Sequence, residues 1–193
     1  MPTALVIIAS TRPGRVGLPV AEWFIAHARE HGAFDLDVVD LADLDLPMMD
    51  EPNHPRLRRY TQQHTKAWSA RVDAADAFVV VTPEYNAGFT APLKNAIDYL
   101  HEEWRWKPVG IVSYGGVSAG LRAANMLRPV LVTLRMTPLT SAVSIPFVKQ
   151  FIDDDGRLEP NETMQEAADA MLDEMVLIER TLRPLREGVE QVA

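Results

Sequence analysis

The stretch Ala77-Phe78-Val79-Val80-Val81-Thr82-Pro83-Glu84-Tyr85-Asn86 decides the fold of this chain. Its apolar, largely β-branched first half is typical of a buried strand, and its second half is typical of a tight polar loop. The segment that follows, from Pro92 to Asp98, returns to helical spacing. In an open α/β sheet, ligands bind beside the loops at the carboxyl ends of the strands. An aromatic ring, an amide and a carboxylate in such a loop suit a flat ligand that forms hydrogen bonds.

Apolar runs and amphipathic segments alternate along the rest of the chain. The expected strands are residues 5–9, 36–41, 77–82, 109–114 and 139–145. The expected helices are residues 17–31, 55–75, 91–104, a segment that begins after Gly120, and 161–183. This alternation predicts an α/β fold, a doubly wound five-stranded parallel sheet in the flavodoxin-like order 2-1-3-4-5 with helices on both faces. We expect residues 1–193 to form one domain.

Two segments fit this scheme less simply. The Asp- and Pro-rich stretch 41–55 has no clear periodicity, and predicts a long surface loop that could border a substrate site. His64 falls on the apolar stripe of its expected helix, which favours a packed histidine over a catalytic one. The five histidines, at positions 27, 31, 54, 64 and 101, have no metal-ligand spacing, so we expect no metal site.

Composition narrows the classes of function. With 193 residues, 47% of them hydrophobic, the chain is expected to be globular. A net charge of -8 argues against general nucleic-acid binding. The absence of cysteine excludes disulfides and a cysteine nucleophile, and fits a reducing compartment. The apolar run 4–9 is too short to span a bilayer, so we expect a cytoplasmic protein without a membrane or nucleic-acid partner.

The loop Ser10-Thr11-Arg12-Pro13-Gly14-Arg15-Val16-Gly17 joins the first strand to a helix, with Pro19 in the first helical turn. Backbone amides at a helix start, two hydroxyls and two arginines predict a phosphate cradle. The loop lacks both the Gly-Lys-Ser/Thr ending of a P-loop and the Gly-x-Gly-x-x-Gly dinucleotide fingerprint. A monophosphate is therefore the favoured ligand, and a plain turn with solvated arginines is the alternative.

Two further loops are expected at the same edge of the sheet. Tyr85 and Asn86 could stack on a planar ring and hydrogen-bond to it, whereas Pro83 directs the chain and Glu84 could accept from a backbone amide. The same residue types also make ordinary turns, so a turn position is the alternative for Asn86. The glycine-rich loop 113–120 would let its backbone approach a ligand closely. Three such loops predict one shared crevice.

At these residues the chain resembles the NAD(P)H-dependent FMN reductase family of flavodoxin-like quinone and azo reductases, over nearly its whole length. The most specific part is Pro83-Glu84-Tyr85-Asn86 with the segment 93–98. The resemblance implies that the FMN phosphate would be held by Ser10, Arg12, Arg15, Val16 and Gly17. It implies that the isoalloxazine would be flanked by Pro83, Glu84, Tyr85 and Asn86. The residues facing its pyrimidine edge would be Ser113, Tyr114, Gly115 and Gly116.

The resemblance also implies hydride transfer from NADPH or NADH through FMN to a quinone, flavin or azo acceptor. Because the cofactor carries this chemistry, no catalytic side chain is expected. Many relatives have a further Ser or Thr late in the phosphate loop, where this chain has Arg15-Val16-Gly17. Phosphate binding here would then rely more on Arg15 and on backbone amides.

The family commonly assembles through the helix that follows Pro83-Glu84-Tyr85-Asn86, which implies a homodimer or homotetramer with Lys94 and Asp98 at the interface. These two residues also have the i,i+4 spacing of a weak intrahelical pair, which needs no partner subunit. Two other functions remain open: a flavodoxin-type electron carrier and a flavin-based redox-sensing module. A carrier would usually have a Ser/Thr/Gly phosphate loop without paired arginines, so the reductase is favoured.

Overall fold

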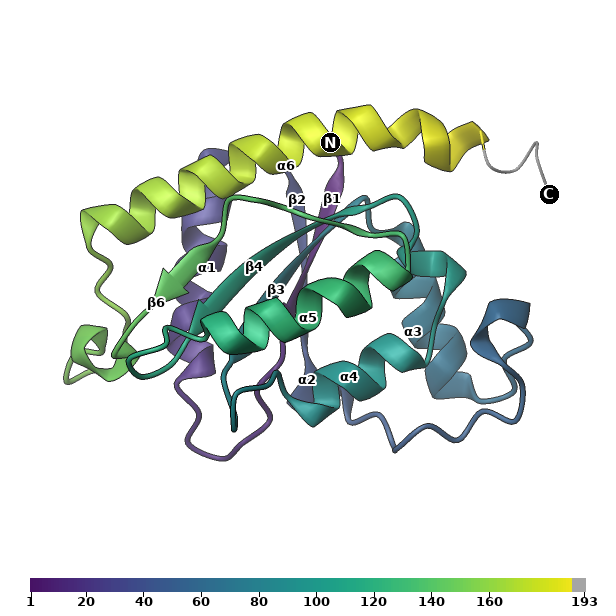
Figure 1. Ribbon diagram of the computed structural model, residues 1–193, viewed down its shortest axis with the longest axis horizontal. Helices are drawn as coiled ribbons and strands as arrows, with labels where there is room; N and C mark the ends of the chain where they lie inside the picture. Colours follow the sequence, from purple (N-terminus) through teal and green to yellow (C-terminus); the bar gives the residue numbers. More distant parts are fainter. Residues whose placement is uncertain (189–193) are drawn as a thin grey trace.

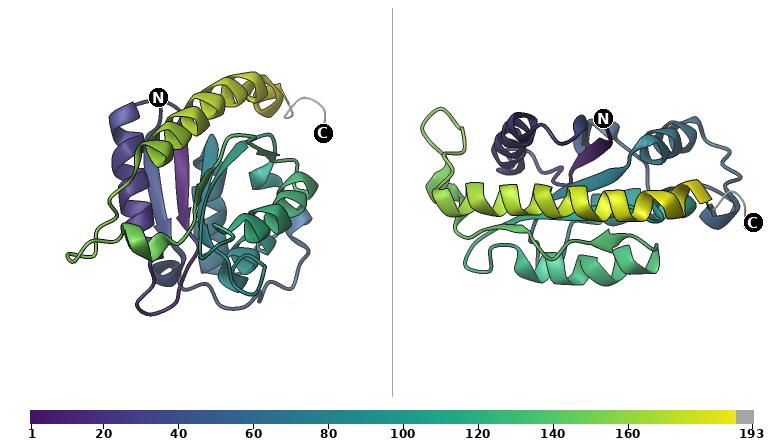
Figure 2. Two further views of the ribbon diagram at one scale, coloured as in Figure 1. Left: turned by 60° about the vertical axis from the view of Figure 1, so that its left-hand side comes forward. Right: turned by 90° about the horizontal axis from the view of Figure 1, so that it is seen from above.

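The structure, a computed structural model, describes residues 1–188 and contains one parallel sheet between two layers of helices (Figures 1 and 2). Its main strands are β1 (Thr3–Ile8), β2 (Asp35–Asp40), β3 (Ala77–Pro83) and β4 (Pro108–Tyr114). They are joined at the β4 edge by the short strands β5 (Thr137–Pro138) and β6 (Val143–Ile145). The order β2-β1-β3-β4-β5 confirms the predicted topology.

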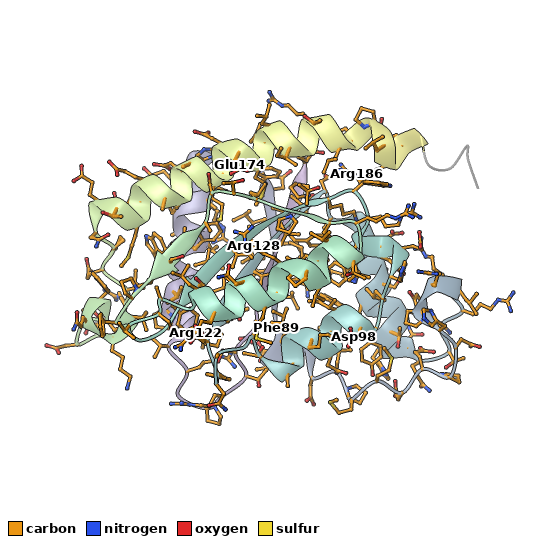
Figure 3. The ribbon with its side chains drawn as sticks, in the orientation of Figure 1. Phe89, Asp98, Arg122, Arg128, Glu174 and Arg186 are labelled. Atoms are coloured by element: carbon orange, nitrogen blue, oxygen red, sulfur yellow. The ribbon has the colours of Figure 1, made fainter. Side chains whose placement is uncertain are left out.

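The single fifth strand expected over 139–145 is wrong, because the chain leaves the sheet between β5 and β6. Glu174 accepts hydrogen bonds from the backbone amides of Thr140, at 2.9 Å, and Ser141, at 2.7 Å. On the other side, the Arg128 guanidinium donates to the Leu139 carbonyl at 2.9 Å. Figure 3 labels both charged side chains, one on each helix beside this segment. Side chains thus replace the ladder bonds that a continuous strand would have formed.

The helices α1 (Gly17–His31) and α6 (Glu162–Gly188) cover one face of the sheet (Figure 2). The opposite face is covered by α3 (Gln63–Ala74), α4 (Ala91–Asp98) and α5 (Leu121–Thr133). All seven residues of β3 are buried, since its side chains alternate between the two cores. Within residues 1–188, no helix combines the length and the apolar character that crossing a bilayer requires.

Two predicted helices are too long. The segment 55–75 contains a 3-10 turn, η1 (Pro55–Leu57), and α3 starts only at Gln63. Glu51 accepts from the backbone amides of Thr61 and Gln62 and so occupies the start of α3. The helix expected over 91–104 ends at Asp98, and a 3-10 turn, η2 (Glu102–Trp104), follows it.

The stretch 41–55 packs over α4. It begins with a short helix, α2 (Leu41–Leu44), and Asn95 binds it at two points: Nδ2 donates to the Pro47 carbonyl at 2.7 Å, and Oδ1 accepts from the Met49 amide at 3.0 Å. His64 is only half-buried and lies 2.9 Å from Asp50, rather than inside the core. The expected surface loop is therefore held against α3 and α4 by hydrogen bonds.

Lys107 is a buried cation at the amino end of β4. Its Nζ donates to the carbonyls of Val72, at 2.8 Å, and Asp73, at 3.1 Å, in the last turn of α3. Burial lowers the pKa of Lys107 to about 8, an effect that the charge of Asp73 only partly opposes. The contact fastens α3 to the sheet.

We predict that Lys107 makes folding stability rise between pH 8 and pH 10. In this window the unfolded chain keeps the lysine protonated, with a pKa of about 10.4, while the folded chain has released the proton. Because the unfolded state binds more protons, the unfolding free energy of the wild type should rise by about 2 kcal/mol relative to Lys107→Met. Urea unfolding at several pH values measures this difference. A constant difference from pH 7 to pH 10 would contradict the prediction.

Candidate functional site

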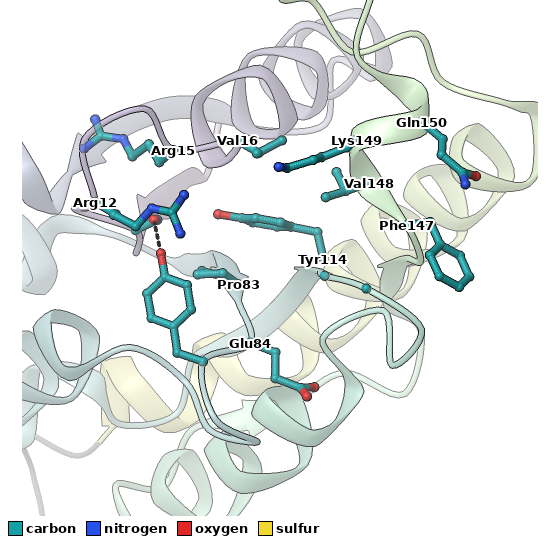
Figure 4. Close-up of a pocket in the computed structure, with 14 residues that line it drawn as sticks. Arg12, Arg15, Val16, Pro83, Glu84, Tyr114, Phe147, Val148, Lys149 and Gln150 are labelled. Atoms are coloured by element: carbon teal, nitrogen blue, oxygen red, sulfur yellow. Dashed lines mark hydrogen bonds between the residues drawn. The ribbon is translucent and has the colours of Figure 1, made fainter.

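The parallel register brings three loops to one edge of the sheet. Ile8 pairs with Val81, and Val81 pairs with Val112, so β1, β3 and β4 end side by side. The loops that follow them surround a cavity of about 440 Å³, a size suited to a small-molecule ligand. Its lining residues, most of them labelled in Figure 4, are Ser10, Arg12, Arg15, Val16, Pro83, Glu84, Tyr85, Tyr114, Gly115, Gly116, Phe147, Val148, Lys149 and Gln150.

All predicted site residues line this cavity except Gly17, Asn86 and Ser113. Sequence reasoning missed the wall formed by residues 147–150, which follows β6. A signal existed: the carboxyl end of the last strand lies at the same edge of the sheet as the other loops. Phe147 stands in the left-handed region, with a φ of +47°, and is 49% exposed at this wall. No sequence pattern predicts a positive φ at Phe147.

Gly17 and Tyr114 meet where α1 begins. A Cβ atom at position 17 would lie 2.4 Å from Tyr114 Oη and 3.3 Å from Ser10 Cβ, so only glycine leaves room there. Gly17 does not line the cavity itself, but it leaves room for Tyr114 and Ser10, which do. The Tyr114 ring is 4% exposed, and Figure 4 shows its hydroxyl pointing toward the loop of Arg12 and Arg15.

Ser113 is turned away from the cavity. Its Oγ donates to the Ala119 carbonyl at 2.9 Å and so closes the glycine-rich loop on itself. Gly120 completes that loop with a φ of +79°, where a Cβ would lie 2.8 Å from Ser113 Cβ. Gly115 donates its amide to the Ile145 carbonyl, and its own carbonyl accepts from Val148. These bonds hold the glycine-rich loop against the segment that follows β6.

Asn86 and Ala87 form a two-residue hairpin turn. Tyr85 and Gly88 exchange two backbone hydrogen bonds of 2.9 Å, and the two residues between them have φ values of +50° and +65°. Positive φ at both central positions is the pattern of a type I′ turn. Asn86 lies at a second, shallower hollow that shares Glu84 and Gly116 with the main cavity, next to Arg122. The turn presents the neighbouring Tyr85, which is 40% exposed, to the main cavity.

Glu84 joins two of the loops. Its buried carboxylate accepts from Arg122 Nε at 2.6 Å and from the Arg122 backbone amide at 3.1 Å. Burial favours the protonated acid, but hydrogen bonds from Ser118 and Arg122 outweigh it and hold the pKa of Glu84 below its usual range. The loop Pro83-Glu84-Tyr85-Asn86, here called the signature loop, and the start of α5 are thus fixed to each other by a charged contact.

The two arginines of the first loop have different environments. Arg15 is largely buried and pairs with Asp40 at the carboxyl end of β2. Arg12 is exposed at the cavity, and no ion pair of Arg12 is present within residues 1–188. Ser10 Oγ and Tyr85 Oη, which both line the cavity, lie 3.0 Å apart. The positive charge available to a ligand therefore comes from Arg12 more than from Arg15.

The arrangement can hold a planar, phosphorylated ligand. The start of α1 offers backbone N–H groups, because its N-cap residue Val16 makes no side-chain capping bond. Pro83, Tyr85 and Val148 supply apolar and aromatic surface beside it. Among residues 1–188, no group of histidines and carboxylates is placed to hold a metal ion.

The chain belongs to the family described as NADPH-dependent FMN reductase, which matches residues 2–150, and the resemblance is confirmed. An NAD(P)H-dependent FMN reductase of Schizosaccharomyces pombe is 43% identical over 75% of this chain and 74% of its own. An FMN-dependent NADPH-azoreductase of Staphylococcus saprophyticus is 26% identical over 67% of this chain and 69% of its own.

The fold recurs in solved structures. The flavoenzyme NAD(P)H:(acceptor) oxidoreductase FerB from Paracoccus denitrificans superimposes with a TM-score of 0.73, over 94% of this chain and 98% of its own. At 21% sequence identity, the likeness establishes a flavodoxin-like fold. The helix α6 lies outside the segment that matches the family, yet it packs against β4 and belongs to the fold.

We predict that Ala87→Gly stabilises the protein. Alanine at a φ of +65° is strained by its Cβ, whereas glycine adopts this conformation freely. The unfolding free energy should rise by about 0.5–1 kcal/mol in chemical denaturation. Ala70→Gly, on the exposed side of α3, is the matched control and should lower it by about 0.5–1 kcal/mol. Equal destabilisation by both changes would show that the turn carries no strain.

Proposed function

We propose that this protein is an FMN-dependent oxidoreductase that passes reducing equivalents from NADPH or NADH to a small-molecule acceptor. The observation that carries the proposal is the cavity where three loops meet, combined with membership of a family described as NADPH-dependent FMN reductase. We treat residues 1–193 as one functional domain. Quinones, flavins and azo compounds are the proposed acceptors, the last because an azoreductase is among the similar proteins.

The residues at the cavity suit the parts of FMN. The phosphate would lie at the start of α1, near Ser10, Arg12 and Val16, with Gly17 leaving the space. The ring system would lie between the signature loop, at Pro83 and Tyr85, and the glycine-rich loop. Since the Gly115 amide is already bonded to Ile145, the Gly116 amide is the better donor toward the ring. Arg15 would act by fixing the loop through Asp40.

Bound FMN supplies hydride transfer, and the protein supplies position and environment. The pair Glu84–Arg122 and the hairpin at Asn86 and Ala87 keep the ring-binding loops in a fixed arrangement. A rigid binding site avoids reorganisation during the reaction, which favours catalysis. Phe147 and Lys149, exposed at the cavity wall, are placed to contact a second molecule that enters beside the cofactor.

We also propose a homodimer or homotetramer. Lys94 and Asp98 form an intrahelical pair of 2.5 Å on α4, so their charges alone do not demand a partner. The neighbouring α5 carries three large apolar side chains that are about half exposed, at Leu121, Met126 and Val132. Covering them would favour association. Sedimentation velocity of the purified protein tests the assembly, and a monomer at micromolar concentration would contradict it.

The function is tested with the purified protein and added FMN. We expect flavin absorption bands that bleach when NADPH or NADH is added without oxygen, and steady-state oxidation of the nucleotide once a quinone or azo dye is present. Bound FMN with negligible turnover would favour a flavodoxin-type electron carrier. Partner binding that changes between the oxidised and reduced states, without turnover, would favour a redox-sensing module. Failure to bind FMN would reject all three.

We predict that Arg12→Ala weakens FMN binding by roughly 10- to 100-fold, because a charged hydrogen bond contributes about 1.5–3 kcal/mol. Fluorescence titration of flavin-free protein measures the affinity. Arg29→Ala, an exposed arginine on α1 outside the cavity, is the control and should leave it unchanged. Wild-type affinity in the Arg12 variant would remove this side chain from the site.

A further inference from the structure

The Tyr114 hydroxyl is a buried polar atom without a hydrogen-bond partner among residues 1–188. The residue is 4% exposed and ends β4. The Ser10 hydroxyl nearby is engaged with Tyr85 at 3.0 Å. A buried hydroxyl that makes no hydrogen bond destabilises the folded state, because water is lost and nothing replaces it. Such groups in native proteins have a reason, and an absent ligand is one.

The position of this hydroxyl indicates what the ligand offers. It lies over Gly17, at 2.4 Å from where a Cβ would stand, so it points at the first residue of α1. The first turn of a helix exposes N–H groups, and Val16 provides no side-chain acceptor for them. The first turn also has no acidic residue. Unpaired donors from two elements therefore converge on one place, which calls for an acceptor with several oxygens.

We propose that Tyr114 donates a hydrogen bond to the phosphate of FMN and so makes the site select FMN over riboflavin. This role rests on the proposed function and assigns Tyr114 to the phosphate rather than to the pyrimidine edge of the ring. Residues 15–17 of the first loop have no hydroxyl side chain, and the Tyr114 hydroxyl supplies one beside them. Arg15 itself is held by Asp40, which leaves Arg12, the helix start and Tyr114 as phosphate donors.

The environment keeps this phenol a donor. Burial raises the pKa of Tyr114 well above its usual range, and Ser10 and Arg15 only partly oppose that effect. A neutral hydroxyl can give its proton to a phosphate oxygen without adding charge. Gly17 is needed for the same arrangement, because any larger residue would displace the ring of Tyr114.

The test is Tyr114→Phe, which removes only the oxygen atom. The flavin-free variant should bind FMN roughly 10- to 100-fold more weakly than the wild type does, because a hydrogen bond to a charged group is lost. Riboflavin, which lacks the phosphate, should bind both proteins within about twofold. In the absence of flavin, the variant should melt about 2–4 °C higher than the wild type, because the unpaired hydroxyl is gone. Saturating FMN should reduce or reverse this difference in melting temperature, because the wild type binds FMN more tightly.

Tyr99→Phe is the matched control. Tyr99 is also fully buried, but its hydroxyl lies 3.0 Å from the Pro47 carbonyl and 3.0 Å from an Asp50 carboxylate oxygen, away from the cavity. Its removal should lower the melting temperature and leave the preference for FMN over riboflavin unchanged. A merely structural role of Tyr114 would produce this same pattern in the Tyr114 variant.

The outcomes separate the inference from the proposed function. If Tyr114→Phe weakened the binding of FMN and of riboflavin equally, the hydroxyl would contact the part that the two molecules share, and the inference would be overturned. Unchanged FMN affinity, or a lower melting temperature of the flavin-free variant, would also overturn it, while bound FMN and turnover in the wild type keep the function intact. If the wild type itself binds no FMN, the proposed function fails first.

Discussion

The parallel pairing of β1, β3 and β4 is the constraint on which the rest of the structure depends. Parallel strands must return by crossovers, so every loop after a strand lies at one edge of the sheet. The register fixes this edge to the residue: Thr82 pairs with Ser113, and Pro83 with Tyr114. The first loop, the signature loop and the glycine-rich loop come from distant parts of the chain. Their meeting is a consequence of strand pairing, with no direct attraction between them required.

Ion pairs and backbone bonds then hold these loops still. Glu84 ties the signature loop to α5 through Arg122, and Asp40 holds Arg15 against the end of β2. The charged groups nearest the cavity thus partly hold its loops in place, and under the proposed function Arg12 is left to bind a ligand. In a chain with a net charge of -8, pairing the arginines with specific carboxylates is easily achieved. An exposed Arg12 at the cavity is the exception that a phosphate would explain.

Some features that do not favour the folded state lie at or beside this cavity, and others, such as the positive φ values of Trp106 and Arg135, lie elsewhere. Ala87 and Phe147 adopt positive φ values, and the Tyr114 hydroxyl is buried without a partner. Elsewhere the core follows ordinary rules, with aromatic and branched side chains packed on both faces of the sheet. Local conflict of this kind is expected where a site is preorganised for a ligand, because binding there compensates for strain that folding alone would remove.

The sequence by itself determined the order of elements, the strand topology and most of the cavity lining. Buried strands such as β3 have a local signature, and the rule for parallel sheets turns their order into a shared edge. Tertiary structure alone decided the division of the last strand at Thr140, where Glu174 takes the backbone amides. It also decided that Arg15 faces Asp40 and that Tyr114 reaches Gly17. These depend on side chains far apart in the chain, whose meeting no local pattern encodes.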